Sequence, residues 1–243
     1  MLMGGTLHIV SMPIGNYDDI TMRAVGVLKG VDEVICEEFR EGKRLLNHYG
    51  IDKPVRRINE HNEKKETPQI IRELKGGKNF ALISDCGTPV FADPGGYLIK
   101  EAVSSNIKLV PVPGASSIMS ALVVSGISME RFIYYGFLSP KREMRRKELL
   151  SIKEIDMPVI LLDTPYRLIS LLEDVADVVG KETYLIVCMD ITSEREEVLR
   201  GRADKIVEKI KGGERKREFV LIIQPKSKLK FKCSAKTLFP HFR

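Results

Sequence analysis

Four loops of the sequence combine glycine, proline and hydroxyl residues in the way that a binding site for a small ligand requires. Each follows an apolar run typical of a buried strand. Glycine lets a ligand approach the backbone closely, proline fixes the direction of a loop, and serine or threonine supplies a hydroxyl group. Any one loop could be an ordinary turn with a good helix cap, such as Ser116, but four together favour a shared ligand site. The loops span residues 13–16 (PIGN), 84–96 (SDCGTPVFADPGG), 112–117 (VPGASS) and 163–167 (DTPYR).

The motifs of several other ligand classes are absent from the sequence. No GxGxxG opens a first helix and no GxxxxGK[ST] occurs, which argues against a standard dinucleotide site and against a P-loop. HExxH is also absent, and the four histidines have no spacing typical of metal ligands. We therefore expect a site without metal.

Composition favours a polyanionic partner and a reducing compartment. Lys and Arg total 39 against 33 Asp and Glu, a net charge of +6 that suits phosphates, although many proteins are mildly basic. The four cysteines lie far apart, which predicts reduced thiols. No apolar run approaches the roughly 20 residues of a membrane span, and the first residues do not resemble a secretory signal. A cytoplasmic location is expected.

The first half of the chain alternates short apolar runs with amphipathic stretches, which predicts βαβ units and a largely parallel sheet. Since parallel strands place the loops that follow them at one edge of the sheet, this arrangement would gather the candidate loops. Strands are expected at 7–12, 31–36, 80–84, 108–112 and 132–137. Helices are expected at 19–29, 43–49, 69–75, 98–104 and 116–125.

The second half is richer in strands and predicts a mixed sheet. A charged helix at 141–154 would link two lobes. Further strands are expected at 159–162, 184–189, 197–200 and 219–223, with helices at 167–179 and 203–211. The sequence therefore predicts an α/β protein with an N-terminal lobe (1–112), a mixed α/β lobe (113–225) and a basic tail (226–243).

The loop sequences resemble those of the bacterial small-subunit rRNA cytidine 2′-O-methyltransferases, which belong to the tetrapyrrole methylase superfamily. The resemblance covers roughly residues 7 to 223 and rests on MPIGNYDDITMRA at 12–24, SDCGTP with ADPG at 84–95, and PVPG at 111–114. It implies two α/β lobes with S-adenosylmethionine bound in the cleft between them, methyl transfer to ribose in rRNA of the small ribosomal subunit, and a homodimer. The cofactor residues that it implies are Ile14, Cys86, Gly87, Thr88, Phe91, Ser116, Ser117, Leu162 and Ile191.

Some positions depart from the family pattern. Residues 36–40 read CEEFR where relatives commonly have AEDTR, residues 163–167 read DTPYR in place of ESPHR, and Cys86 replaces an alanine. The cofactor loops match the family better than the positions expected to face the methyl acceptor. The differences therefore affect the identity of the acceptor more than that of the cofactor.

A ribose hydroxyl is a poor nucleophile, so a side chain that accepts its proton would help the reaction. The candidate bases are Glu37, Glu38, Asp85 and His61. Each could instead order a loop or be a solvated charge. Arg23, Arg40 and Arg167 are candidates for holding RNA phosphates, because the guanidinium fork matches phosphate oxygens; salt bridges to nearby carboxylates are an equal alternative.

Two other functions remain open on the sequence alone. One is methylation of a carboxylated tetrapyrrole, although such enzymes generally have a GxGPGD-type loop where this chain has SMPIGN at 11–16. The other is an RNA-binding scaffold that has lost catalysis. Cofactor binding and the identity of the methylated acceptor distinguish the three functions.

Overall fold

The computed structural model describes residues 4–91, 93–128, 130–213 and 216–225, so the predicted basic tail at 226–243 lies outside the described residues. The chain forms two compact units. The first contains Met1–Ser120 with Ile191–Glu194, and the second contains Ala121–Asp190 with Arg195–Arg243. A boundary after residue 112 was expected from the sequence; the units divide after Ser120, and a short segment from the second half joins the first unit.

The first unit is built on a five-stranded parallel sheet of order β3-β2-β4-β1-β5. The predicted parallel sheet is therefore confirmed. Strand β4 is buried along its whole length, as expected for a parallel strand covered on both faces. The strands are β1 (Thr6–Val10), β2 (Glu33–Cys36), β3 (Val55–Arg57), β4 (Phe80–Ile83) and β5 (Lys108–Val112).

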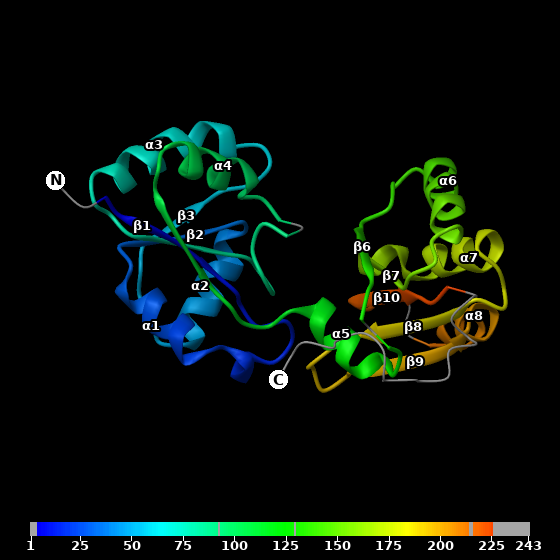
Figure 1. Ribbon diagram of the computed structural model, residues 1–243. Coiled ribbons are helices and arrows are strands. Elements are labelled where there is room, and N and C mark those ends of the chain that lie inside the picture. The colour runs from blue at the N-terminus through cyan, green and yellow to red at the C-terminus, as the bar shows by residue number, and fades with distance from the viewer. Residues whose placement is uncertain (1–3, 92, 129, 214–215, 226–243) are drawn as a thin grey trace, which may run out of the picture. The chain divides into compact units, whose positions relative to one another are not determined.

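Helices cover both faces of this sheet. Figure 1 shows α1 (Met22–Gly30) and α2 (Phe39–His48) on one face, with α3 (Glu63–Lys75) and α4 (Gly96–Ser104) on the other. Alternate residues of β1 serve the two cores, because successive strand side chains point to opposite faces. Val10 belongs to the same core cluster as Leu28 of α1, whereas Leu7 belongs to the cluster that contains Leu98 of α4.

The neighbouring strands β1 and β4 continue to opposite faces of the sheet. After β1 the chain forms the short helix η1 (Tyr17–Asp19) and then α1, whereas after β4 it proceeds to α4 on the other face. Loops that diverge in this way from adjacent parallel strands leave a crevice at the carboxyl edge of the sheet. This edge is where the first and second candidate loops begin.

The edge strand β3 was missed by the sequence analysis because two of its three residues are arginines. Arg56 is held by Glu33 of β2 at 2.7 Å and by Glu73 of α3 at 3.0 Å. All three side chains are mostly buried. The carboxylates therefore satisfy a charge that the local sequence would assign to solvent.

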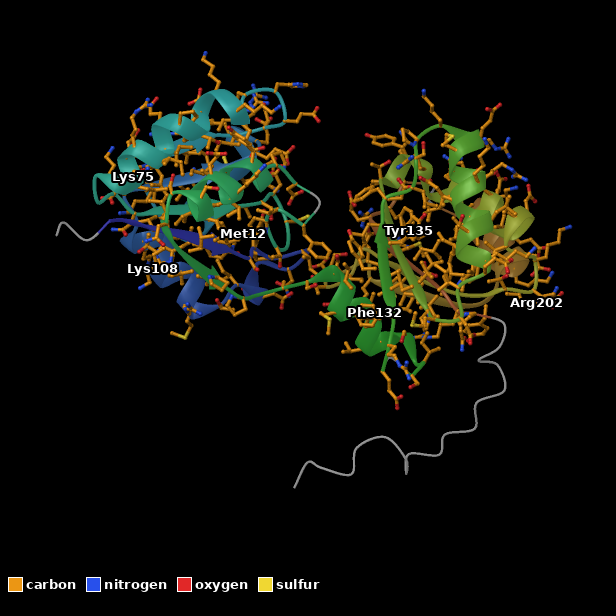
Figure 2. The ribbon with its side chains drawn as sticks, turned by 45° about the horizontal axis from the view of Figure 1, so that its top comes forward. Met12, Lys75, Lys108, Phe132, Tyr135 and Arg202 are labelled. Carbon is orange, nitrogen blue, oxygen red and sulfur yellow. The ribbon has the colours of Figure 1, made fainter. Side chains whose placement is uncertain are left out.

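The second unit contains a mixed five-stranded sheet of order β6-β7-β10-β8-β9, as predicted. Only β6 and β7 are parallel to each other within it; the other neighbours are antiparallel. Phe132 and Tyr135 mark the β6 segment in Figure 2. The strands are β6 (Ile133–Gly136), β7 (Val159–Asp163), β8 (Tyr184–Met189), β9 (Glu197–Arg202) and β10 (Phe219–Ile223).

Helices α6 (Arg142–Lys153), α7 (Leu168–Val178) and α8 (Ala203–Lys211) share one core with this sheet. The helix α5 (Ser117–Ser125) runs across the division between the units. The charged segment at 141–154 was expected to link the lobes, but α6 lies inside the second unit, where Arg145 is buried against Asp174 of α7 at 2.7 Å. Among the described residues, no helix is both long and apolar enough to cross a membrane.

Candidate functional site

The loops after β1 and β4 are joined by a pair of backbone hydrogen bonds. The Met12 amide donates to the Gly87 carbonyl at 2.8 Å, and the Gly87 amide donates to the Met12 carbonyl at 3.1 Å. The hydroxyls of Ser11 and Thr88 lie 3.0 Å apart beside this bridge. The two loops are thus joined to each other at the carboxyl edge of the sheet.

Gly87 occupies a position that other residues adopt with difficulty. Its φ is +71°, in the left-handed region, and a Cβ there would lie 3.3 Å from Cγ2 of Ile14. The Ser84 hydroxyl donates to the carbonyls of Cys86 and Gly87 at 2.8 and 3.0 Å, and these hydrogen bonds fix the turn at residues 84–87. The loop is therefore shaped by its own hydrogen bonds, with Cys86 and Thr88 exposed at its surface.

The loop after β5 packs against Ser11, next to the bridge between Met12 and Gly87. Gly114 approaches Ser11 so closely that a Cβ on the glycine would be 3.0 Å from the serine Cβ. The Ser11 amide donates to the Val112 carbonyl at 3.1 Å. Ser116, expected as a helix cap, accepts a hydrogen bond from the Met119 amide at 3.4 Å on its hydroxyl. Ser116 and Ser117 are half-buried at the start of α5.

A segment from much later in the chain completes this cluster of loops. The Asn16 amide donates to the Thr192 hydroxyl at 3.1 Å, across 176 residues of sequence. Gly15 lies so close to Ile191 that an added Cβ would be 2.6 Å from its carbonyl oxygen. The predicted residues Ile14 and Ile191 thus belong to loops that touch each other.

The structure places the predicted cofactor residues as follows. All except Leu162 belong to the first unit, in the loops just described. Leu162 lies on β7 of the second unit, opposite Val220 of β10. Phe91 is exposed within the second loop. Their roles toward a cofactor stay predictions.

Three carboxyl groups gather at the carboxyl edge of the first sheet. Glu37 follows β2, Asp85 follows β4, and Asp93 lies in the loop before α4. Restricted contact with water is the main cause that raises the pKa of all three groups, and repulsion by nearby carboxylates adds to it; for Asp85 these are Glu41 and Glu38. For Glu37 the repelling charges are Asp93, Asp85 and Glu60; for Asp93 the charge is Asp85. Asp85 is itself exposed, and an amide hydrogen bond from Glu38 partly opposes its shift.

Asp93 was not among the predicted catalytic residues. Its ADPG context is typical of a turn, and nothing in the local sequence indicates that it comes near Asp85 and Glu37. A carboxylate with a raised pKa is a stronger base than an ordinary one and is a functional-site candidate for that reason.

The other two candidate bases have different surroundings. Glu38 caps helix α2, where its Oε1 accepts from the Arg40 amide at 3.5 Å, and it faces Arg57 at 3.6 Å. His61 is exposed, with Glu60 at 3.3 Å. The contacts of Glu38 match the loop-ordering alternative, so Glu37 and Asp85 are the stronger candidates of the four.

The three candidate arginines also differ. Arg23 and Arg40 are exposed, on α1 and in the first turn of α2. Arg167 donates to Oδ1 of Asp163 at 2.6 Å and to the Leu138 carbonyl at 3.3 Å, inside the second unit. Of the two roles considered for Arg167, a phosphate contact or a salt bridge, the structure shows a salt bridge.

The fold and the loops define a class of protein. The model of the Tetrapyrrole (Corrin/Porphyrin) Methylases family matches residues 6–207. A solved structure of diphthine synthase superposes with a TM-score of 0.72 at 19% identity, covering 91% of this chain and 90% of that chain. At this identity the likeness shows a common fold, and the family match places the chain among methylases.

Curated relatives narrow the class. "Ribosomal RNA small subunit methyltransferase I" of Buchnera aphidicola (subsp. Schizaphis graminum) is 39% identical over 238 residues, which cover 96% of this chain and 84% of the relative. The protein of the same name from Haemophilus influenzae is 38% identical over 92% of this chain and 80% of its own length. The chain therefore belongs to the ribosomal RNA small subunit methyltransferase I family within the tetrapyrrole methylases, which confirms the resemblance seen in the loop sequences.

Proposed function

We propose that the protein transfers the methyl group of S-adenosylmethionine to the 2′-hydroxyl of a cytidine in small-subunit ribosomal RNA. One observation carries the proposal. In a chain 39% identical to a named ribosomal RNA small subunit methyltransferase, the loops after β1 and β4 are bonded to each other at the left-handed Gly87. Such a glycine at the carboxyl edge of a parallel sheet is where an α/β fold binds a small ligand.

The loops of the first unit suit a cofactor with one charged end and one aromatic end. Gly87 and Gly114 let the loops pack closely against Ile14 and Ser11, where a Cβ would lie 3.3 and 3.0 Å from the neighbouring side chain. Thr88, Ser116 and Ser117 carry hydroxyls that can bind polar groups. Ile14 and Phe91 supply apolar surface. Bound S-adenosylmethionine supplies an activated methyl group, so the protein has to hold it and align the acceptor oxygen with it.

The remaining task is to accept the proton of the ribose hydroxyl. Glu37 and Asp85 are proposed for this role: burial raises the pKa of both carboxyl groups, and repulsion by Asp93 raises that of Glu37 further. The proton passes from the hydroxyl to a carboxylate oxygen as the methyl group leaves sulfur for oxygen. A base with a raised pKa performs this step better near neutral pH.

As pH falls, the rate of methyl transfer should drop at a higher pH than it would if the base were a carboxylate with an ordinary pKa. The base must be deprotonated, and its raised pKa moves protonation upward, so the rate falls as pH drops through that value. Asp93→Asn removes one of the charges that raise the pKa of Glu37, so if Glu37 is the base the acidic limb should move to lower pH. The measurement is the single-turnover rate against pH for both proteins. An unmoved limb would exclude Glu37 as the base and leave Asp85.

Cys86 allows cofactor binding to be tested chemically. Its side chain is exposed in the second loop, whereas burial and nearby carboxylates raise the pKa of Cys36 to about 12 and burial raises that of Cys188 to about 11. Buried thiols with a raised pKa react slowly. In a Cys233→Ser background, a maleimide should label Cys86 first, and S-adenosylhomocysteine should slow that labelling at least about tenfold, since a bound ligand shields the loop. Unchanged labelling with saturating ligand would place the cofactor elsewhere.

The acceptor is tested by offering two substrates. Protein with methyl-labelled S-adenosylmethionine is incubated with small ribosomal subunits lacking the modification, or with uroporphyrinogen. Label in the RNA supports the proposal. Label in the tetrapyrrole alone would support the first alternative, and cofactor binding without transfer to either would support a scaffold.

Two finer points complete the proposal. An rRNA substrate implies a cytoplasmic protein, and the family resemblance implies a homodimer. The molecular mass in solution, measured by light scattering, should be twice the chain mass of 27.4 kDa.

A further inference from the structure

Helix α2 carries a row of exposed basic and aromatic side chains. Arg40, Arg44 and His48 stand four residues apart, so they share one face of the helix, and all three are exposed. The core-facing side of the same helix carries Leu45 and Leu46. We propose that this face binds an unpaired stretch of the RNA substrate, with Arg40 and Arg44 on phosphates and a base stacked on His48. The inference rests on the proposed function.

The stacking position is already formed. The rings of His48 and Tyr17 lie 4.3 Å apart with an interplanar angle of 30°. Tyr49 packs edge-on to both rings and donates its hydroxyl to the Tyr17 carbonyl at 2.9 Å. One side of the imidazole is thus held by protein while the residue remains exposed. A fixed aromatic ring open on one side is the platform on which single-stranded nucleic acids stack their bases.

This face lies beside the candidate chemistry. Helix α2 starts three residues after β2 ends. Arg40, in its first turn, is therefore only three residues from Glu37 at the carboxyl edge of the sheet. The pKa of Asp85 is raised mainly by burial, and the positive charge of Arg44 partly opposes that rise, so the guanidinium lies within electrostatic reach of a candidate base. Tyr17 follows directly after the first candidate loop at 13–16. RNA on this face would therefore run past the methyl-transfer site of the same unit.

The arginines of this face differ from others in the chain. Arg145, Arg167 and Arg217 are bound to nearly buried carboxylates, and their side chains are 5%, 21% and 11% exposed. Arg44 pairs with Glu41 of its own helix at 2.6 Å, and both side chains are well exposed. An exposed pair of this kind contributes little and exchanges readily for a phosphate. Arg44 can therefore turn to RNA without leaving a buried charge unpaired.

The test compares two double variants of the full chain that lose the same charge. Arg40→Gln/Arg44→Gln changes the proposed face, and Arg72→Gln/Lys75→Gln changes exposed residues of α3 on the opposite face of the sheet (Lys75 is labelled in Figure 2). Affinity for unmodified small-subunit RNA is measured by filter binding at several salt concentrations. The α2 variant should bind at least about tenfold more weakly, and the slope of log K against log salt should fall by roughly 1.5, since each phosphate contact contributes 0.7 to 0.9. The α3 variant should match wild type.

A third variant isolates the stacked base. His48→Ala should weaken RNA binding about fivefold or more while changing the salt slope far less than the arginine variant does. S-adenosylhomocysteine affinity, measured by calorimetry, should be unchanged in all three variants. Equal effects of the α2 and α3 variants, or a normal slope without Arg40 and Arg44, would overturn the inference although wild-type methylation of RNA still stands. Failure of the wild-type protein to bind or methylate RNA would overturn the proposed function as well.

Discussion

Gly87→Val should abolish binding of S-adenosylmethionine while the chain still folds. Valine is β-branched and is strongly disfavoured at a φ of +71°, and its Cβ would meet Ile14 at 3.3 Å. The loop would have to move, which breaks the bridge between Gly87 and Met12. We expect cofactor affinity, measured by calorimetry, to fall at least about a hundredfold, which corresponds to about 2.7 kcal/mol.

Gly50→Val is the matched control for that substitution. Gly50 also has a left-handed φ, +62°, but an added Cβ would meet nothing within 4 Å. The two variants share the backbone strain of valine in this region, so both should lose some stability. Only Gly87→Val should lose the cofactor. If both variants bind normally, the second loop does not form the cofactor site.

Of the substitutions described here, Asp174→Ala should cause the largest loss in the free energy of unfolding. Asp174 is fully buried and accepts hydrogen bonds from Arg142, Arg145 and Arg146 of α6. Removing it leaves the buried guanidinium of Arg145 without its counter-charge, which typically costs about 3–5 kcal/mol. Hydrogen exchange should show the loss as faster exchange in α6 and α7, since these helices belong to the second unit. Asp177→Ala is the control, because its contact with Arg146 is long, at 3.5 Å, and exposed.

The same network should depend on pH in a defined direction. Burial alone would raise the pKa of Asp174, but the hydrogen bonds from the three arginines lower it below its ordinary value. A carboxyl group with a lower pKa in the folded state stabilises the fold above its unfolded pKa, and that contribution disappears as pH falls through the folded value. Acid should therefore weaken the second unit of wild type more than that of Asp174→Ala. Equal acid sensitivity would show that the network contributes little.

The strands were the most predictable part of the fold. β8 and β10 are central or nearly central in their sheet and almost wholly buried, so they read as continuous apolar runs, and their predicted bounds are those of the structure. β3 could not be predicted, because its arginine is paired with carboxylates that lie 17 and 23 residues away. Such pairing exists only once the sheet and α3 have formed.

The site was predictable as a set of loops but not as a set of contacts. The positions of the loops follow from the strand pattern, since parallel strands end at one edge. The bond from Asn16 to Thr192 and the repulsion among Glu37, Asp85 and Asp93 depend on how the loops fold over that edge. The ion pair of Arg167 could have been predicted from the sequence, because Asp163 lies four residues before it.

Mapping of 2′-O-methyl groups in small-subunit RNA tests the proposed ribose methylation most directly. Ribosomal RNA would be taken from cells with the gene, without it, and with the gene restored as Gly87→Val or Gly50→Val. We expect one cytidine 2′-O-methyl group that is present with the wild-type gene, absent without it, restored by Gly50→Val and not by Gly87→Val. An identical set of 2′-O-methyl groups in small-subunit RNA with and without the gene would contradict the proposed function.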